Sequence, residues 1–496
     1  MEQVKRGIVR ASWRGVRVMV LEVVGGLACG GLGTTTESNG DGSGRPNVIY
    51  ILADDLGYGD LGIYGQKLIA TPNLDRLAAE GMMFTQHYAG SPVCAPSRAS
   101  LMSGLHTGHT VIRGNREVQP EGQHPIPDSR ITLAERLKDL GYRTAGIGKW
   151  GLGAPETEGV PTRQGFDYFF GYNDQREAHS YYPDHLWRNE ERVELKGNRA
   201  GGRRTYSHDL LVDDVLRFIR QEQDAPFFLY VPFTIPHAGL DVPDDSMKPY
   251  LGRFEEVPSE AQGRYISQLT PRAAFAGMIS RLDRDVGRIV GLVDDLSLSE
   301  RTLIIFTSDN GPHQEGGAEP EFFGSNGDLR GFKRDLYEGG IRVPMIARWL
   351  GTVAAGTAAD HVSAFWDVTP TLLELAGAPM LPNLDGLSFA PTLRGEAQEA
   401  HDYLYWEFHP SYYHDQVWKQ AIRLGDWKGV RFSGLEGLEG SIELYDLARD
   451  PSESRDVAGN HPGVITQIGR LMREAHTPSE LFPFPGERRE DPDPAR

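Results

Sequence analysis

Short apolar runs and amphipathic stretches alternate along most of the chain. Runs rich in β-branched and apolar residues are typical of buried strands, and they cover residues 47–52, 143–147, 226–233 and 302–307. Apolar residues recur at helical spacing over 73–80, 131–140, 210–221 and 275–293. Strands that alternate with helices favour a parallel sheet covered on both faces. We therefore predict an α/β fold with a large, mostly parallel sheet flanked by helices on both faces, spanning residues 46–385.

The alternation ends near Gly386. Several short strand-like runs with turns between them fill residues 403–445, and a helical pattern follows over 463–475. This order predicts a smaller C-terminal α+β subdomain, residues 386–478, built on a short antiparallel sheet. Residues 479–496 are predicted to be a tail, and its end, residues 485–496, is charged and Pro-rich, so we expect that end to be solvated.

The first residues have the layout of an export signal. Five basic side chains, from Lys5 to Arg17, accompany a short apolar stretch over 16–27, which Glu22 interrupts. Ala28-Cys29 then resembles the cleavage site of a bacterial lipoprotein. We predict a signal peptide over 1–28, with Cys29 as a lipid-anchor candidate, and a flexible Gly/Ser/Thr-rich linker over 29–45. The protein is expected in the periplasm or at the cell surface, and no other run reaches the ~20 apolar residues of a membrane span.

Composition narrows the classes of function. Of 496 residues, 39% are hydrophobic and 24% are charged, which is typical of a globular protein rather than a disordered one. The net charge of −18 argues against nucleic acid as a partner. The chain has two cysteines, so Cys94 stands alone once Cys29 is processed. A lone thiol in an exported protein asks for a chemical role.

Acidic and amide side chains follow two of the predicted strands. Asp54 and Asp55 come directly after the first strand, and Asp309 and Asn310 after the fourth. Ligands gather at the carboxyl ends of strands in open α/β sheets, and oxygen donors suit Ca²⁺ or Mg²⁺ rather than zinc. A single Asp-Asp pair could equally make a turn or a helix cap. Two such pairs after buried strands indicate a metal site.

Cys94 lies where the pattern predicts the beginning of a helix. Pro96 suits the first turn of a helix and Gly104 suits its end. The free amides and the dipole at a helix N-terminus favour an anion, and Arg98 lies four residues on, on the same helix face. We therefore expect an anion site in which Cys94 is at least an activated thiol. The alternative is a small buried apolar residue.

Several short motifs follow one another in a specific order. They are Asp54-Asp55, Cys94-Ala-Pro96-Ser-Arg98, Gly148-Lys149-Trp150, Pro236-His237, Asp309-Asn310-Gly311, Gly331-Phe-Lys333 and Tyr337-Glu-Gly-Gly340. Residues 423–428 and 444–451 add two more in the C-terminal subdomain. This order resembles the type I, formylglycine-dependent sulfatase family, which is arylsulfatase-like and belongs to the alkaline phosphatase superfamily. The resemblance covers roughly residues 45–475.

The resemblance implies a mechanism. Asp54, Asp55, Asp309, Asn310 and the modified Cys94 would hold a Ca²⁺ ion. A sulfatase-maturing enzyme would oxidise Cys94 to formylglycine, whose hydrate attacks sulfur and gives a covalent sulfo-enzyme. The second hydroxyl of the hydrate then expels sulfate. Arg98, Lys149 and Lys333 would stabilise the sulfuryl oxygens, and His237, together with Lys333, would protonate the leaving oxygen.

One position departs from the family pattern. Members often show Gly-Lys-Trp-His-Leu-Gly, in which the histidine assists turnover, whereas this chain has Gly151 at that place. His179 is our first candidate for the missing function, or for a substrate contact, ahead of His106 and His109. The aromatic-rich segment 165–189 suits a sugar ring, so a sulfated carbohydrate is the expected substrate, with Glu407 facing the same site.

Two other functions remain open at this point. A phosphate- or phosphonate-ester hydrolase of the same superfamily could use this architecture, although we see no separate Asp-x-x-x-His cluster for a second metal ion. A non-catalytic glycan-binding relative would have lost a site residue beyond position 151, and none is missing.

Overall fold

The computed structural model describes residues 44–261, 263, 265–410, 417–433 and 440–487. The predicted signal peptide, Cys29 and the linker up to residue 43 lie outside these residues, as do residues 488–496 of the predicted tail. No helix within the described ranges combines the length and apolar character needed to cross a bilayer.

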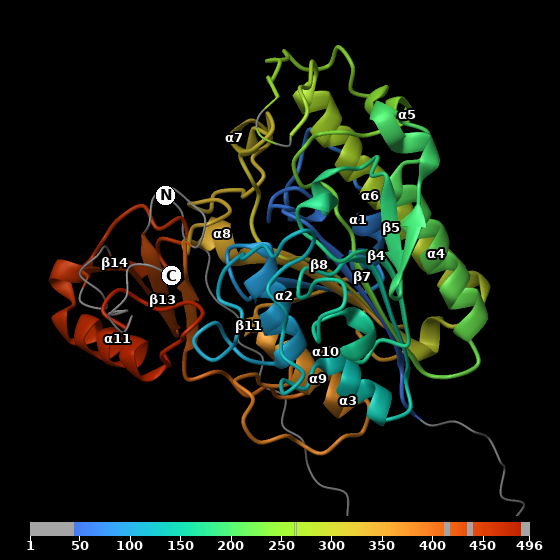
Figure 1. The fold of residues 1–496 in the computed structure, drawn as a ribbon. Coiled ribbons are helices and arrows are strands. Elements are labelled where there is room, and N and C mark those ends of the chain that lie inside the picture. The colour runs from blue at the N-terminus through green and yellow to red at the C-terminus, as the bar shows by residue number, and fades with distance from the viewer. Residues whose placement is uncertain (1–43, 262, 264, 411–416, 434–439, 488–496) are drawn as a thin grey trace, which may run out of the picture. The chain divides into compact units, whose positions relative to one another are not determined.

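One large sheet forms the centre of the fold (Figure 1). Its strands in the described chain are β1 (Asn47–Ala53), β2 (Met82–Tyr88), β3 (Arg143–Lys149), β4 (Tyr168–Tyr172), β5 (His185–Arg188), β6 (Glu191–Glu194), β7 (Phe227–Pro232), β8 (Thr302–Ser308), β9 (Arg342–Arg348), β10 (Thr357–Ala359) and β11 (Ser363–Ala364). They lie in the order β10-β2-β9-β8-β1-β7-β3-β4-β5-β6, with β11 paired to β2.

The sheet is parallel in its middle and mixed toward its edges. β1, β3, β4, β7 and β8 pair in parallel, whereas β9 runs antiparallel to both β2 and β8. β4, β5 and β6 form an antiparallel edge. The prediction of a mostly parallel sheet is confirmed.

Helices cover both faces of the sheet. The helices of the described chain are α1 (Pro72–Ala79), α2 (Cys94–Ser103), α3 (Leu133–Asp139), α4 (Ser207–Glu222), α5 (Asp244–Met247), α6 (Pro271–Asp295), α7 (Pro320–Phe323), α8 (Glu338–Ile341), α9 (Val368–Leu375), α10 (Ala390–Arg394) and α11 (Pro462–Glu474). Figure 1 shows α4 and α6 on one side of the strands and α2, α3, α9 and α10 on the other.

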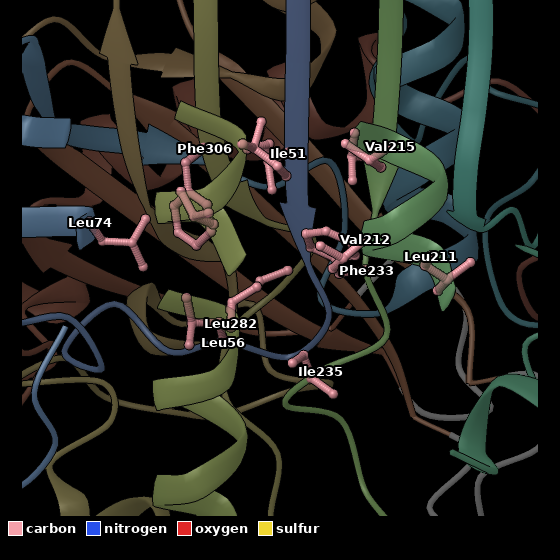
Figure 2. Packing of buried hydrophobic residues seen from close by; sticks show 14 of the residues in the cluster. Ile51, Leu56, Leu74, Leu211, Val212, Val215, Phe233, Ile235, Leu282 and Phe306 are labelled. Carbon is pink, nitrogen blue, oxygen red and sulfur yellow. The ribbon is translucent and has the colours of Figure 1, made fainter. Parts of the chain in front are cut away.

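β1, β7 and β8 each contribute alternate side chains to two hydrophobic cores. From β1, Ile49 and Ile51 join the core beneath α1, α4 and α6, while Val48 and Tyr50 join the core beneath α2, α3 and α9. Figure 2 shows the first core, in which Ile51 and Phe306 of the sheet meet the helices. Two buried faces explain the continuous apolar runs of these strands.

The C-terminal region forms a second, smaller sheet. β12 (Leu404–Phe408), β13 (Trp418–Leu424), β14 (Trp427–Ser433) and β15 (Ile442–Asp446) are antiparallel neighbours in that order. Trp406 and Val430 face Tyr88 and Trp366 of the large sheet region, and α11 covers the opposite face. The predicted small antiparallel sheet is confirmed.

Part of the segment predicted as a tail packs against the protein. Phe482 and Phe484 are each 1% exposed. The Trp418 indole donates to the Pro483 carbonyl, and the His476 ring lies 2.6 Å from a Glu487 carboxylate oxygen. Residues 479–487 are therefore held by two buried aromatic rings, and composition alone did not reveal those anchors.

Candidate active site

The predicted metal ligands lie together at the carboxyl ends of two neighbouring strands. β1 and β8 pair in parallel up to Ala53 and Ser308, so Asp54 and Asp309 follow side by side. Asp54, Asp55, Asp309 and Asn310 are all fully buried. The Asp55 amide donates to the Asp309 carboxylate at 3.1 Å, which ties the two strand ends together. Asp55 has a φ of 64°, a left-handed conformation that aspartate tolerates better than most residues.

Cys94 is the first residue of α2, as predicted. Val93 before it is extended, and Gly104 ends the helix with a φ of 71°. Every residue of α2 is buried, and the Cys94 Sγ lies 3.4 Å from Asp54 Oδ1. The expectation of an activated thiol is wrong, because burial raises the pKa of Cys94 far above its ordinary value, and the Asp54 carboxylate adds to the effect against the opposing Lys149.

Each site carboxylate pairs with a buried cation. Arg98 donates to Asp309 through Nε and Nη2, at 3.1 and 2.7 Å. Lys149 Nζ lies 2.6 Å from Asp54 Oδ2, and Lys333 Nζ lies 2.6 Å from Asp55 Oδ2. Burial alone would raise the pKa of Asp54, but Lys149 and other cations hold it below its ordinary value.

The donors at the strand ends fit a hard divalent cation. Asp54, Asp55, Cys94 and His237 form a buried group that could hold a metal ion. The Asn310 Oδ1 is buried and has no hydrogen-bond partner in the described part of the chain. Burial and the Asp54 carboxylate raise the pKa of Asp309 to about 7, so a bound cation would stabilise its ionised form. An orphaned amide oxygen among crowded carboxylates is a donor set suited to Ca²⁺.

His237 joins the predicted site through Lys333. Its Nδ1 lies 2.5 Å from the Ala238 carbonyl, which fixes the proton on that nitrogen. Nε2 therefore accepts, and Lys333 Nζ lies 3.0 Å from it. Burial lowers the pKa of His237 well below its usual range, with Lys333 as the next cause, so the ring is neutral.

Three imidazole rings stack beside these groups. His179 stacks on His237 with 4.3 Å between ring centroids and 14° between planes, and His313 stacks on His237 with centroids 5.7 Å apart. Tyr265 packs against His179 with ring centroids 5.5 Å apart. Burial, with Lys149 and Lys333, lowers the pKa of His179 to about 3. The structure thus brings His179 to the site, although its role stays a prediction.

The other candidate histidines lie elsewhere. His106 and His109 stack on each other and group with Asp385, whose carboxylate is 2.9 Å from His109 Nδ1. Glu407 does not face the site as expected. It is 1% exposed and binds Arg113, from the segment between α2 and α3, and His476 of the C-terminal region.

Three residues near the site were not predicted from the sequence. His313 groups with Asp55 and Glu315, and its position four residues after Asp309 was the signal that could have found it. This group shares Asp55 with the first, so it is no separate second site. Tyr265 and Gln175 come from connecting segments whose paths no local pattern predicts.

Comparisons with known proteins place this site in a family. Residues 46–378 match the family model described as sulfatase, and residues 328–476 match one described as N-sulphoglucosamine sulphohydrolase, C-terminal. The chain belongs to the sulfatase family, and it is a sulfuric ester hydrolase.

Individual relatives span most of the chain. Human arylsulfatase A is 33% identical over 477 residues, covering 86% of each chain. N-acetylgalactosamine-6-sulfatase of Canis lupus familiaris is 33% identical and covers 88% of this chain and 81% of its own. The crystal structure of Ps i-CgsB, also solved with k-i-k-neocarrahexaose, has a TM-score of 0.72 at 28% identity, covering 87% of this chain and 92% of its own.

Proposed function

We propose that the chain hydrolyses the sulfate ester of a carbohydrate through a formylglycine made from Cys94, with a bound Ca²⁺ ion. The observation that carries this proposal is the placement of Cys94. It is buried at the beginning of α2, 3.4 Å from Asp54. Its raised thiol pKa makes the unmodified side chain a poor nucleophile at neutral pH. An oxidised residue that attacks through oxygen removes that difficulty.

The proposed reaction has two displacements. One hydroxyl of the hydrated aldehyde attacks sulfur, and the bond from sulfur to the sugar oxygen breaks. The second hydroxyl then loses its proton, the carbon–oxygen bond to the sulfate breaks, and the aldehyde returns. Water adds to the aldehyde and restores the hydrate. A serine lacks the second hydroxyl, so it would stop at the sulfo-enzyme.

The cations that now pair with carboxylates supply the charge for binding sulfate. Each of these cations binds one carboxylate of the site. Arg98 binds Asp309, Lys149 binds Asp54 and Lys333 binds Asp55. We assign Asp54, Asp55, Asp309, Asn310 and residue 94 as the Ca²⁺ ligands. Bound Ca²⁺ would supply Lewis-acid polarisation of the sulfate group. Since His237 Nε2 accepts from Lys333, the Lys333 ammonium is the proton source for the leaving oxygen, and His237 holds it in place.

His179 completes the proposed site as a neutral ring. Its stacking on His237 and Tyr265 supports a role at the leaving group or the sugar. We propose that His179 performs the proton transfer that the family's histidine performs at position 151, where this chain has glycine. Relatives named N-acetylgalactosamine-6-sulfatase, and a neighbour solved with k-i-k-neocarrahexaose, support a sulfated sugar as substrate. The signal-like N-terminus supports export, with Cys29 as the anchor candidate.

Two measurements test the proposal. Mass spectrometry of the peptide containing residue 94 should show a mass about 18 Da below that of cysteine, or its hydrate. Galactose, glucosamine and N-acetylgalactosamine carrying one sulfate should be screened for sulfate release, with the matching phosphate esters as the comparison. Full activity with an intact thiol would refute the mechanism. Faster release of phosphate than of sulfate would favour the phosphate- or phosphonate-ester alternative.

A further inference from the structure

Two buried amide groups beside the site have no partner. Asn173 and Gln175 follow β4 and are 1% and 5% exposed. Asn173 Oδ1 and Gln175 Nε2 are both buried without a hydrogen-bond partner in the described chain. Buried polar groups in native proteins are almost always hydrogen-bonded, because an unpaired one lowers stability. We therefore expect a bound ligand to supply the hydrogen bonds that these two groups lack.

Their position connects them to the reacting groups. β3 and β4 pair in parallel, with Lys149 opposite Tyr172. Beyond the strands, the Trp150 amide donates to the Tyr172 carbonyl and the Gly151 amide to the Asn173 carbonyl. The segment 173–175 thus runs alongside the one that begins at Lys149, whose ammonium binds Asp54.

Gly151 leaves the space that Gln175 fills. A Cβ added at Gly151 would lie 2.8 Å from Gln175 Nε2 and 3.0 Å from its Cγ. The φ of Gly151 is 74°, which also favours glycine. A side chain at position 151 would occupy the space that Gln175 now fills. The position of Gln175 therefore depends on glycine at position 151.

The polarity of the pair identifies what it recognises. Gln175 Nε2 is a donor and Asn173 Oδ1 is an acceptor. A sulfate oxygen can only accept, so it could pair with Gln175 and would leave Asn173 unpaired. A hydroxyl both donates and accepts, so it matches both unpaired atoms in polarity. We propose that Asn173 and Gln175 bind the sugar hydroxyl next to the sulfate ester, and so select sulfated sugars over sulfate esters that lack this hydroxyl.

This inference rests on the proposed sugar-sulfatase function, and its test separates the two. The probes are 4-nitrophenyl sulfate, the sulfated monosaccharide cleaved fastest in the screen above, and the analogue of that sugar lacking the neighbouring hydroxyl. If the wild type releases sulfate from none of the sugars, the proposed function fails. The inference depends only on how the variants change the ratio of kcat/KM between probes.

Four variants carry the test. Asn173→Ala, Gln175→Ala and the volume-conserving Gln175→Met should each lower kcat/KM for the sugar about 10-fold, and for 4-nitrophenyl sulfate less than about 2-fold. Gly151→Ala, which pushes Gln175 aside, should have the same effect. For the analogue that lacks the neighbouring hydroxyl, the variants and the wild type should have similarly low kcat/KM.

Stability without substrate provides a second readout. Removing an unpaired buried amide should raise the Tm, so we expect Gln175→Met to melt about 1–3 °C higher than the wild type. The matched control is Gln420→Ala, which removes a buried amide that donates to Tyr405 in the C-terminal sheet. Gln420→Ala should lower the Tm but leave unchanged the ratio of kcat/KM for the sugar to that for 4-nitrophenyl sulfate. Equal losses on both sulfate esters, or no loss on the sugar, would overturn the inference.

Discussion

At the scale of single residues, the site is a balanced set of buried charges. Three carboxylates face three cations, each pair within 2.7 Å at its shortest contact. Buried ion pairs add little net stability against apolar packing, and removing one partner is costly. Their retention here fits groups that exchange partners when a cation and an anion bind.

Removing one carboxylate tests the metal site. Asp54→Ala or Asp309→Ala should abolish turnover, since each takes one of the few charged ligands proposed for Ca²⁺. Chelation should inactivate the wild type and Ca²⁺ should restore it, and calorimetry should show Ca²⁺ binding to the wild type alone. Asp283→Asn is the control, because Asp283 is buried but caps α1 through Asn73 and Leu74. Full activity in exhaustively demetallated protein would contradict the assignment.

A second substitution tests His179. General acid–base assistance contributes about 10²–10⁴-fold, so His179→Ala should lower kcat by that range. His109→Ala, whose ring binds Asp385 instead, should leave kcat unchanged. A higher KM with kcat intact would make His179 a substrate contact, and no change in either constant would make it structural.

At the scale of elements, the contact between the two sheets contains a charge cluster. Lys428 of β14 lies 2.8 Å from Glu338 of α8 and 3.4 Å from Glu453. The Glu338 amide donates to Glu453 at 2.6 Å. Two buried carboxyl groups share one lysine, so one of them tends to keep its proton. Burial raises the pKa of Glu453 to about 7, and Glu338 adds to the shift although Lys428 opposes it.

This cluster makes stability depend on pH. A carboxyl whose pKa is raised by folding stabilises the protein fully below its ordinary value of 4.5, and this contribution disappears as the pH rises through about 7. The free energy of unfolding should therefore fall between about pH 5 and pH 8, by on the order of 2 kcal/mol. Glu453→Gln should flatten this slope in urea unfolding, whereas Glu443→Gln in β15 should not. An unchanged slope in Glu453→Gln would refute the assignment.

The strands that were predicted from the sequence differ in burial and pairing from β9, which was not predicted. β1, β7 and β8 are buried on both faces and show continuous apolar runs. β9 contains Pro344, which ordinarily argues against a central strand. Pro344 is tolerated because it lies beyond Met345, where pairing with β8 ends, and opposite a register shift between Phe84 and His87 of β2.

The same contrast holds for the site. Asp54, Asp55, Asp309 and Asn310 could be placed together because parallel strands end at one edge of a sheet. His179, Tyr265 and Gln175 come from connecting segments, whose folding depends on tertiary contacts far along the chain. The Cys94 thiol was misjudged for a related reason, since its pKa is governed by burial that a helix pattern does not report.

At the scale of the whole molecule, the C-terminal residues hold distant segments together. Arg113 binds Glu407 at 2.8 Å and the Thr477 carbonyl at 2.6 Å. Phe484 packs edge-on against His476, with ring centroids 4.9 Å apart, and Phe482 packs against His409.

These contacts predict that the segment 479–487 stabilises the fold. Phe482→Ala should lower the free energy of unfolding by about 3–5 kcal/mol, as for other buried phenylalanines. Glu480→Ala, on an exposed neighbour, should change it by less than about 0.5 kcal/mol. Urea unfolding measures both. Equal effects would show that the segment only rests on the surface.

The burial of Cys94 also bears on when the proposed formylglycine can form. α2 is buried along its whole length, and Cys94 is 1% exposed. In the finished fold an enzyme could not reach this side chain. The sheet beneath α2 closes late, because Val48 of β1 pairs with both Phe228 and Leu303. Cys94 thus leaves the ribosome well before the strands that will enclose it. The proposed oxidation to formylglycine would fall in that interval, and biosynthesis rather than the mature structure would then decide which molecules become active.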